Sequence, residues 1–355
     1  MIKVLIVDDS SFMRVRIRKL LETSNEIKVI GIARDGIDAL RKTMLLKPDV
    51  ITMDINMPDI SGIETVELIM KQCPTPIIMV SSLTYDGAYE TLEALEKGAV
   101  DYIHKDHLSE KALIEKILIA KDTKLNAGAS STQKPVTGTI EDILETHAAE
   151  VFKPQPAADL ITKPRSFSII GIGISTGGPS ALAKVLPGIS EDIPASIVIA
   201  QHMPSNFTKP LAERLNKISR LHVKEAENGE KLIPGHAYIC PGGRHIMVDQ
   251  KGTVSLHDKE SFAQYHYCPS ASLLMSSISR LHAENAMCII MTGMGSDGLE
   301  GIIEAKKRGS YVIAQSEDSS VIFGMPKAVI SNNLQDEIVH LDNIADRINE
   351  LCLKG

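Results

Sequence analysis

Ser175 is the residue of this sequence whose setting most favours covalent chemistry. It is the centre of the pattern Gly173-x-Ser175-x-Gly177, which follows an apolar run typical of a buried strand and precedes Pro179, a favoured first residue of a helix. A strand that turns sharply into a helix lifts the serine hydroxyl above the carboxyl edge of a sheet. Helix N–H groups beside that hydroxyl favour developing negative charge. The pattern therefore predicts a serine nucleophile.

A glycine-rich turn after a strand also occurs in dinucleotide-binding folds. In this sequence Thr176 occupies the place of the third glycine of that fingerprint. The next apolar run, residues 195–200, ends in Gln201-His202 rather than in an acidic residue that would bind a ribose. These two departures favour the nucleophile over a bound dinucleotide.

A serine nucleophile needs a base and an orienting acid, and two other predicted strand ends supply them. His202 follows the run at 195–200, and Asp297 follows the run at 286–291. Histidine suits proton transfer near pH 7, and aspartate fixes the tautomer of the imidazole. If both strands neighbour the one before Ser175, the three side chains meet at one sheet edge. Backbone N–H groups of Thr176 and Met294 are then the natural oxyanion donors.

A second group of reactive residues lies in the first third of the chain. Five apolar runs, at residues 3–7, 28–32, 50–53, 76–80 and 100–103, alternate with helical patterns. This alternation predicts a (βα)5 domain with a parallel sheet over residues 1–122. The polar residues that follow these runs are Asp8, Asp9, Asp54, Ser81 and Lys105. Converging carboxylates suit Mg²⁺, and a lysine with a small hydroxyl suits phosphoryl oxygens, so the group predicts phosphoryl transfer to a carboxylate.

Residues 166–355 repeat the alternation and predict a second, three-layer α/β/α domain built on a parallel sheet. Strands are expected at residues 166–174, 195–200, 237–240, 286–291 and 310–314, and helices at 178–186, 206–218, 270–282 and 297–307. A β-hairpin is expected at residues 245–256, turning at 250–252. The two domains share architecture, but no internal repeat connects them.

Residues 123–165 read as a linker between the domains. Unpatterned residues at 126–135 and 153–156 flank a stretch, 139–152, with apolar residues at helical spacing. A transient helix in a tether and a helix that docks between the domains both fit this pattern.

Composition and charge exclude several classes of protein. The chain has 355 residues and a formal net charge of −7, and neither domain offers the basic surface that DNA binding needs. Five cysteines without a C-x-x-C pair favour a reduced cytoplasm over a disulfide framework or a zinc site. The N-terminus does not resemble a signal peptide, and no apolar run reaches membrane-spanning length. We therefore expect a cytoplasmic protein that binds no nucleic acid.

Residues 1–120 resemble a two-component receiver domain. The motifs that carry this resemblance are Val7-Asp8-Asp9-Ser10, Met53-Asp54-Ile55-Asn56-Met57-Pro58, Ser81, and Tyr102-Ile103-His104-Lys105. The resemblance implies that Asp54 accepts a phosphoryl group, and that Asp8, Asp9, Asp54 and the Asn56 carbonyl hold Mg²⁺. It also implies that Ser81 and Lys105 bind the phosphoryl group, with Tyr102 as an aromatic switch. From the residues alone, Tyr102 fits an ordinary half-buried aromatic equally well.

Residues 166–340 resemble the chemotaxis receptor methylesterase family. The motifs are residues 173–179, Gln201-His202-Met203-Pro204, residues 235–239, residues 292–298 and Phe323-Gly324-Met325-Pro326. The resemblance implies hydrolysis of glutamyl methyl esters on chemoreceptors, with release of methanol, and deamidation of glutamines as a second activity. It implies that an unphosphorylated receiver covers the site, and that phosphorylation of Asp54 by a chemotaxis histidine kinase uncovers it. It also implies ester chemistry without a cofactor, and Mg²⁺ only in the receiver.

The sequence departs from these families at two places. Asp106 follows Lys105, where receivers usually have proline. Cys268 and Ser272 stand where the methylesterases more usually have arginine and aspartate, in a loop expected near the substrate.

Two other kinds of protein are alternatives to a hydrolase. A receiver fused to a non-catalytic α/β binding module would keep the Asp54 site without needing the residues around Ser175. A DNA-binding response regulator would need a helix-turn-helix pattern and basic charge, and the sequence has neither.

Overall fold

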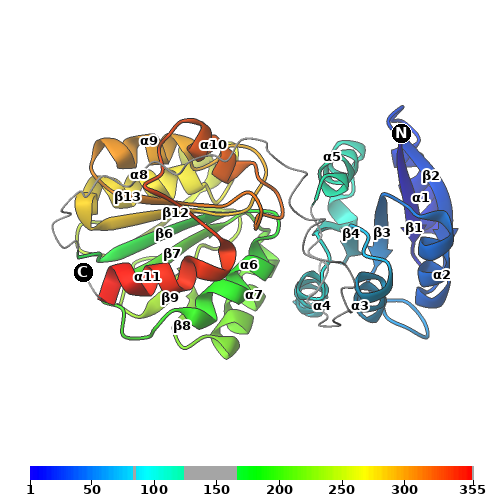
Figure 1. The fold of residues 1–355 in the computed structure, drawn as a ribbon, viewed down its shortest axis with the longest axis horizontal. Helices are drawn as coiled ribbons and strands as arrows, with labels where there is room; N and C mark the ends of the chain where they lie inside the picture. The colour runs from blue at the N-terminus through cyan, green and yellow to red at the C-terminus, as the bar shows by residue number, and fades with distance from the viewer. Residues whose placement is uncertain (83–84, 124–165, 354–355) are drawn as a thin grey trace, which may run out of the picture.

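The computed structural model contains two parallel sheets, each covered by helices on both faces (Figure 1). It describes residues 1–82, 85–123 and 166–353, with the side chains of Tyr85 and Asp86 left out. The predicted linker, residues 123–165, lies outside this description apart from Thr123, as does the helical pattern at 139–152. None of the helices in the described ranges has the length and apolar character that a membrane span requires.

The first sheet has the strand order β2-β1-β3-β4-β5, and each pair of neighbours is parallel. Its strands are β1 (Ile2–Val7), β2 (Ile27–Ala33), β3 (Val50–Asp54), β4 (Ile77–Ser81) and β5 (Asp101–His104). Its helices are α1 (Ser11–Leu21), α2 (Gly36–Leu46), α3 (Gly62–Gln72), α4 (Tyr85–Glu96) and α5 (Glu110–Lys121). The middle strands β3 and β4 are buried at every residue, which explains why most of their residues are apolar.

Short polar residues begin the helices of this domain. Ser10, Asp35, Ser61 and Ser109 each accept a hydrogen bond from a backbone N–H of the following helix. Ser61 and Glu64 form a reciprocal capping box. Each cap fixes the residue at which the loop after a strand ends and the next helix begins.

The second sheet has the strand order β14-β13-β12-β6-β7-β9-β8, and its paired strands are parallel. Its strands are β6 (Ile169–Ile174), β7 (Ser196–Gln201), β8 (His222–Glu225), β9 (His236–Ile239), β12 (Ala286–Ile290), β13 (Tyr311–Gln315) and β14 (Glu337–Val339). A separate antiparallel hairpin joins β10 (Arg244–Val248) to β11 (Val254–Asp258). Because β6 lies between β12 and β7, the chain segments before Ser175, His202 and Asp297 are neighbours.

Helices cover both faces of this sheet, which gives the predicted three layers (Figure 1). On one face lie α6 (Gly178–Val185), α7 (Ser205–Ile218) and α11 (Ile344–Leu353). On the other lie α8 (Ala271–His282), α9 (Leu299–Lys307), α10 (Met325–Ser331) and the β10–β11 hairpin. Helices α4 and α5 of the first domain face this second domain (Figure 1).

Several elements differ from the sequence-based expectation. The helix expected to begin at Asp297 begins at Leu299, because Gly298 adopts a φ of 101° that an ordinary helical residue does not. The strand expected from residue 166 begins at Ile169. The sequence patterns indicated nothing at β8, β14, α10 and α11. These strands have only three or four residues, and α10 has only seven, which is too short to show a period.

Candidate functional site

Ser175 lies at the carboxyl end of β6, in the turn that leads into α6. Its backbone N–H donates to the carbonyl of Thr292 at 3.0 Å, and its own carbonyl accepts from Gly178 at 2.8 Å. Gly177 has a φ of 78°, and Pro179 stands in the first turn of α6, as the sequence pattern predicted. The serine is partly exposed and lies at the N-terminus of a helix.

Two glycines beside Ser175 leave no room for a larger residue. A Cβ at Gly293 would lie 2.7 Å from the Cβ of Ser175, and a Cβ at Gly178 would lie 1.9 Å from Oε1 of Gln201. The chain passes so close at these points that only glycine fits without rearrangement.

His202 and Asp297 form a hydrogen-bonded pair beside this turn. Nε2 of His202 lies 2.8 Å from Oδ2 of Asp297. An ionised carboxylate can only accept, so Nε2 carries the proton and Nδ1 of the neutral ring is the acceptor. Nδ1 is buried and has no partner among the described residues. The imidazole is therefore arranged to accept a proton at Nδ1.

Asp297 lies at the N-terminus of α8 rather than capping its own helix. Its carboxylate accepts from the backbone N–H groups of Ala271 (2.7 Å) and Ser272 (3.0 Å) and from the Ser270 hydroxyl (3.0 Å). Burial raises the pKa of Asp297, but hydrogen bonds from His202 and from the α8 backbone outweigh it and lower the pKa to about 2. The carboxylate thus stays ionised and fixes the tautomer of His202.

Gln201 joins the two sides of this arrangement, and the sequence analysis did not give it a role. Its Nε2 donates to the carbonyls of Ser175 (3.0 Å) and His202 (3.1 Å). The side chain is 1% exposed and follows the apolar residues 197–200 of β7. A buried amide at a strand end was the signal in the sequence that could have identified it.

The two predicted oxyanion donors lie in turns at the same sheet edge. Over the described part of the chain, neither the N–H of Thr176 nor that of Met294 donates a hydrogen bond within the protein. The side chain of Thr176 contacts the first domain, because its hydroxyl donates to Oδ2 of Asp101 at 3.3 Å. Met294 lines a hollow along α5 with Ile114 and Leu118.

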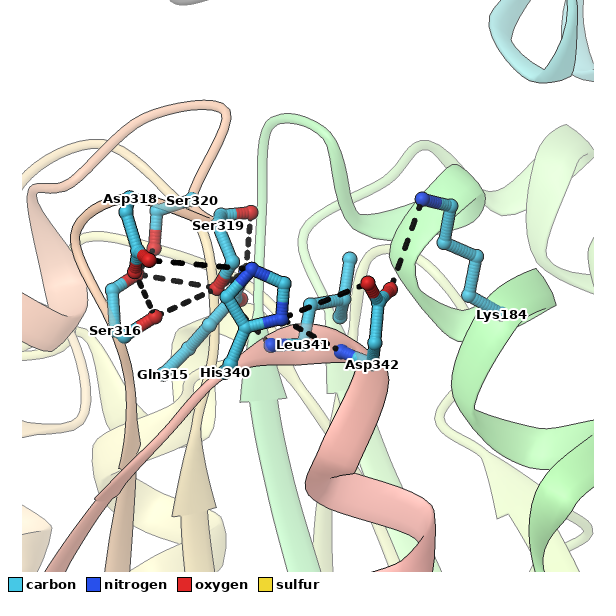
Figure 2. A network of polar contacts seen from close by, with 9 residues as sticks. All are labelled: Lys184, Gln315, Ser316, Asp318, Ser319, Ser320, His340, Leu341 and Asp342. Carbon is cyan, nitrogen blue, oxygen red and sulfur yellow. Dashed lines mark hydrogen bonds and ion pairs between the residues drawn. The ribbon is translucent and has the colours of Figure 1, made fainter. Parts of the chain in front are cut away.

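A second polar network lies at the carboxyl ends of β13 and β14, on the same edge of the sheet (Figure 2). His340 lies between Asp318 and Asp342, and Lys184 of α6 contacts Asp342 at 3.9 Å. The hydroxyl of Ser319 accepts from the backbone N–H of Leu341 at 3.0 Å. The network holds the loop at residues 316–323, which is bonded to the segment beside Ser175. The carbonyl of Ile322 accepts from the N–H of Gly293, and the N–H of Ile322 donates to the hydroxyl of Thr292, both at 3.0 Å.

Ser175 and His202 line a cleft of about 540 Å³ whose walls come from both domains. The second domain also contributes Thr176, Tyr267 and Cys268, and the first domain contributes Asp101, Tyr102, His104 and Lys116. The first domain therefore forms one wall above the residues that could act on a substrate.

Contacts between α4, β5 and the second domain hold this wall in place. Tyr102 stacks on Phe207 of α7, with ring centroids 4.6 Å apart. The Ser180 hydroxyl donates to the carbonyl of Leu95 at 2.9 Å. Arg214 forms a two-pronged ion pair with Glu96, and the Tyr89 hydroxyl donates to Glu213. The residue predicted as an aromatic switch thus contacts the second domain directly.

The acidic residues predicted at the carboxyl edge of the first sheet do converge. Asp8, Asp9 and Asp54 place one carboxylate oxygen each within 4.8 Å of one another. Nζ of Lys105 lies 2.8 Å from Oδ1 of Asp54, and the buried Ser81 hydroxyl has no partner in the described ranges. Asn56 is exposed, and its side chain contacts Glu90 at 3.4 Å.

Burial and mutual repulsion disfavour the ionised form of these acids. Burial, helped by the charge of Asp54, raises the pKa of Asp8 to about 6. Burial also raises the pKa of Asp54, although Lys105 beside it acts in the opposite direction. Oδ2 of Asp8 is buried without a partner among the described residues. Clustered, partly orphaned carboxylate oxygens are a donor set that fits Mg²⁺.

The structure also locates the departures from the family patterns. Asp106 is exposed in a short 3₁₀ turn, Lys105–His107, and its N–H donates to Nδ1 of His104. Cys268 lines the cleft, as expected of a loop near a substrate. Ser272 does not reach it, because it is buried and its hydroxyl accepts from Gly298 behind Asp297.

The fold and the two sites together define the class of protein, which is a two-domain regulator. Its first domain has the receiver fold with a cluster of acidic residues, and its second is an α/β domain with a serine, a histidine and an aspartate at the carboxyl edge of its sheet. Family models match residues 4–118 as a response regulator receiver domain and residues 170–348 as a CheB methylesterase. The chain belongs to the CheB methylesterase family and carries a receiver domain. This membership supports the hydrolase over the non-catalytic binding module.

Similar proteins span the whole chain. A protein-glutamate methylesterase/protein-glutamine glutaminase of Lawsonia intracellularis is 47% identical over all of both chains. One of Halalkalibacterium halodurans is 45% identical over 99% of this chain and 98% of its own. The crystal structure of the Thermotoga maritima CheB methylesterase catalytic domain matches with a TM-score of 0.50 and 38% identity, covering 52% of this chain and 99% of that one.

Proposed function

We propose that this chain is a phosphorylation-activated serine hydrolase that removes methyl esters from glutamate side chains of chemoreceptors. The same site would deamidate glutamines, because an amide and an ester share the carbonyl that a nucleophile attacks. Relatives that match the full chain carry both activities in their names. The arrangement of Ser175, His202 and Asp297 on three neighbouring strands supports this chemistry.

In the first step, the Ser175 hydroxyl attacks the ester carbonyl while Nδ1 of His202 takes its proton. Asp297, ionised at neutral pH, stabilises the imidazolium that results. The N–H groups of Thr176 and Met294 would hold the oxyanion. His202 then returns the proton to the methoxy oxygen, methanol leaves, and water attacks the acyl-enzyme by the same route.

Asp54 would be the phosphoacceptor of the receiver, with a chemotaxis histidine kinase as the phosphodonor. Asp8, Asp9, Asp54 and the Asn56 carbonyl would hold Mg²⁺, which neutralises the charge that gathers during phosphoryl transfer. Ser81 and Lys105 would bind the phosphoryl oxygens. Tyr102 would transmit the change, since it stacks on Phe207 of the second domain.

The regulatory part of the proposal depends on the wall that the receiver forms over the cleft. A substrate as large as a methylated chemoreceptor would need that wall to move, and phosphorylation of Asp54 would favour the moved state. We place the receiver at residues 1–122, the linker at 123–165 and the esterase domain at 166–355, in the cytoplasm. The esterase chemistry itself would need no cofactor.

The observation that carries the proposal is the pair His202–Asp297 with Nδ1 of His202 unpartnered in the same cleft as Ser175. The test is methanol release from methyl-labelled chemoreceptor membranes, with and without acetyl phosphate and Mg²⁺. The unsubstituted protein should release methanol, more so with the phosphodonor, and Ser175→Ala should release none while still accepting phosphate. Equal release by Ser175→Ala would exclude the serine mechanism.

A further inference from the structure

The imidazole of His202 is held by an aromatic ring against its face as well as by the hydrogen bond to Asp297 at its edge. The ring of Tyr267 lies parallel to it, with centroids 4.4 Å apart and an angle of 4° between the planes. Asp297 holds the edge through Nε2, and the backbone of His202 is tied to Ile174 and Gln201. Tyr267 therefore stacks on the His202 ring, whose Nδ1 would accept the proton of Ser175.

The phenol of Tyr267 also reaches the loop that carries Asp297. A Cβ built on Gly295 would lie 3.2 Å from the Tyr267 hydroxyl oxygen, so the ring spans from His202 to the 293–298 loop. Burial, together with the charges of Glu115 and Asp297, raises the pKa of Tyr267. The phenol stays neutral, and its ring keeps the electron-rich face that attracts a cation.

The backbone of Tyr267 is fixed by contacts that do not involve its own ring. It belongs to a strap, residues 259–268, that crosses the β10–β11 hairpin. Phe262 and Tyr265 of the strap pack edge-on against the buried His245, and the carbonyl of Cys268 accepts from Gly243. Because the strap is anchored elsewhere, replacing the Tyr267 ring should leave its course intact.

We propose that Tyr267 is a positioning residue for His202, a role that rests on the proposed esterase function. Its ring keeps the imidazole in the plane that directs Nε2 to Asp297 and Nδ1 to the cleft. When the Oγ–H bond of Ser175 breaks and an Nδ1–H bond forms, the imidazolium lies against the π-face of the phenol, which stabilises it. The stabilisation is greatest at the step where positive charge develops on the ring, and so assists the proton transfer.

The test is the titration of the His202 imidazole in the full chain, followed by NMR with labelled histidine and assigned through the signal that His202→Gln loses. We expect Tyr267→Leu to lower the pKa of His202 by about half a unit to one unit, the size of a partly buried cation–π contact. Tyr267→Phe keeps the π-face and should restore the titration. Gln264→Leu, at an exposed position of the same strap that takes no part in anchoring it, is the matched control.

The acid limb of kcat/KM should move in the same direction, because activity needs the neutral imidazole. In Tyr267→Leu the limb should shift to lower pH by the same amount, while kcat falls about tenfold as orientation is lost. An unchanged His202 titration in Tyr267→Leu, or an equal shift in Gln264→Leu, would overturn the proposal. The NMR titration needs no turnover, so its result is separable from failure of the esterase function itself.

Discussion

The hydroxyl of Thr176, the residue next to Ser175, donates a hydrogen bond to Asp101 of the first domain at 3.3 Å. Asp101 is the first residue of β5, and Oδ2 of the same carboxylate forms an ion pair with Lys116 of α5 at 2.6 Å. The turn that presents the proposed nucleophile is thus bonded to the receiver strand that also carries Tyr102. A displacement of β5 would be transmitted to Ser175 through Thr176 alone.

The Arg214–Glu96 ion pair is a contact between the domains that can be removed without touching either site. We expect Arg214→Ala to raise methanol release without a phosphodonor about twofold to fivefold, because a partly exposed pair contributes roughly 0.5–1 kcal/mol to the covered state. Arg280→Ala breaks a comparable pair within the second domain, with Glu304, and should leave release unchanged. A fall in release with Arg214→Ala would contradict the covering role of the receiver.

Asp54→Asn should separate basal activity from its regulation. The variant keeps a side chain that Lys105 can contact but loses the carboxylate that would accept the phosphoryl group. We expect release without phosphodonor to match the unsubstituted protein, and acetyl phosphate to have no further effect. Asp122→Asn, an exposed substitution at the end of α5, should respond fully to acetyl phosphate. Strong stimulation of Asp54→Asn would reject Asp54 as the acceptor.

Asp297 should stabilise the fold as well as orient His202. Its pKa is lowered in the folded protein to about 2, below the value of about 4 that is usual for an aspartate, so its contribution is complete above about pH 4 and is lost as the pH falls through about 2. That shift corresponds to about 2 kcal/mol. Urea unfolding should show Asp297→Asn less stable than the unsubstituted protein by this order at pH 7, with a difference that shrinks toward about pH 2. A constant difference across this range would show that the carboxylate's charge is not responsible.

Gly178→Ala should disturb the site through Gln201. The new Cβ would lie 1.9 Å from Oε1 of Gln201 and would displace the amide that joins the carbonyls of Ser175 and His202. We expect a loss of roughly 1–3 kcal/mol of unfolding free energy and at least a tenfold loss of kcat. In a Gln201→Ala background the same substitution should cost much less stability, which a double-mutant cycle measures. Additive costs would show that the two residues do not interact.

The sequence predicted the parts of the fold that depend on local pattern. Alternating apolar runs located the five strands of the first sheet, and Ser175, His202 and Asp297 were each assigned to strand ends. Short edge strands such as β14 were missed because three residues show no period. The order β12-β6-β7, which brings the three residues together, depends on the packing of helices on both faces and was only assumed from the sequence.

The site held features that no single-residue pattern could reveal. A short polar residue just before a helix is commonly the cap of that helix, but the carboxylate of Asp297 accepts N–H groups from α8, a helix that begins 26 residues earlier in the chain. Tyr267 belongs to a loop without periodicity, and its stacking on His202 follows from the strap's course across the hairpin. Contacts between segments distant in sequence decide both cases.

The position of β6 between β12 and β7 has a consequence for how the protein is made. Ser175 and His202 emerge from the ribosome long before Asp297, whereas the receiver domain, matched over residues 4–118, emerges before all three. Domains fold in the order of synthesis. We therefore expect the receiver domain to be folded before Ser175, His202 and Asp297 come together in each new chain. Stalled chains that end before Met287 should fold their receiver, accept phosphate and release no methanol. A newly made molecule would then leave the ribosome with its cleft already covered by the receiver domain, and no form with an uncovered cleft would precede it.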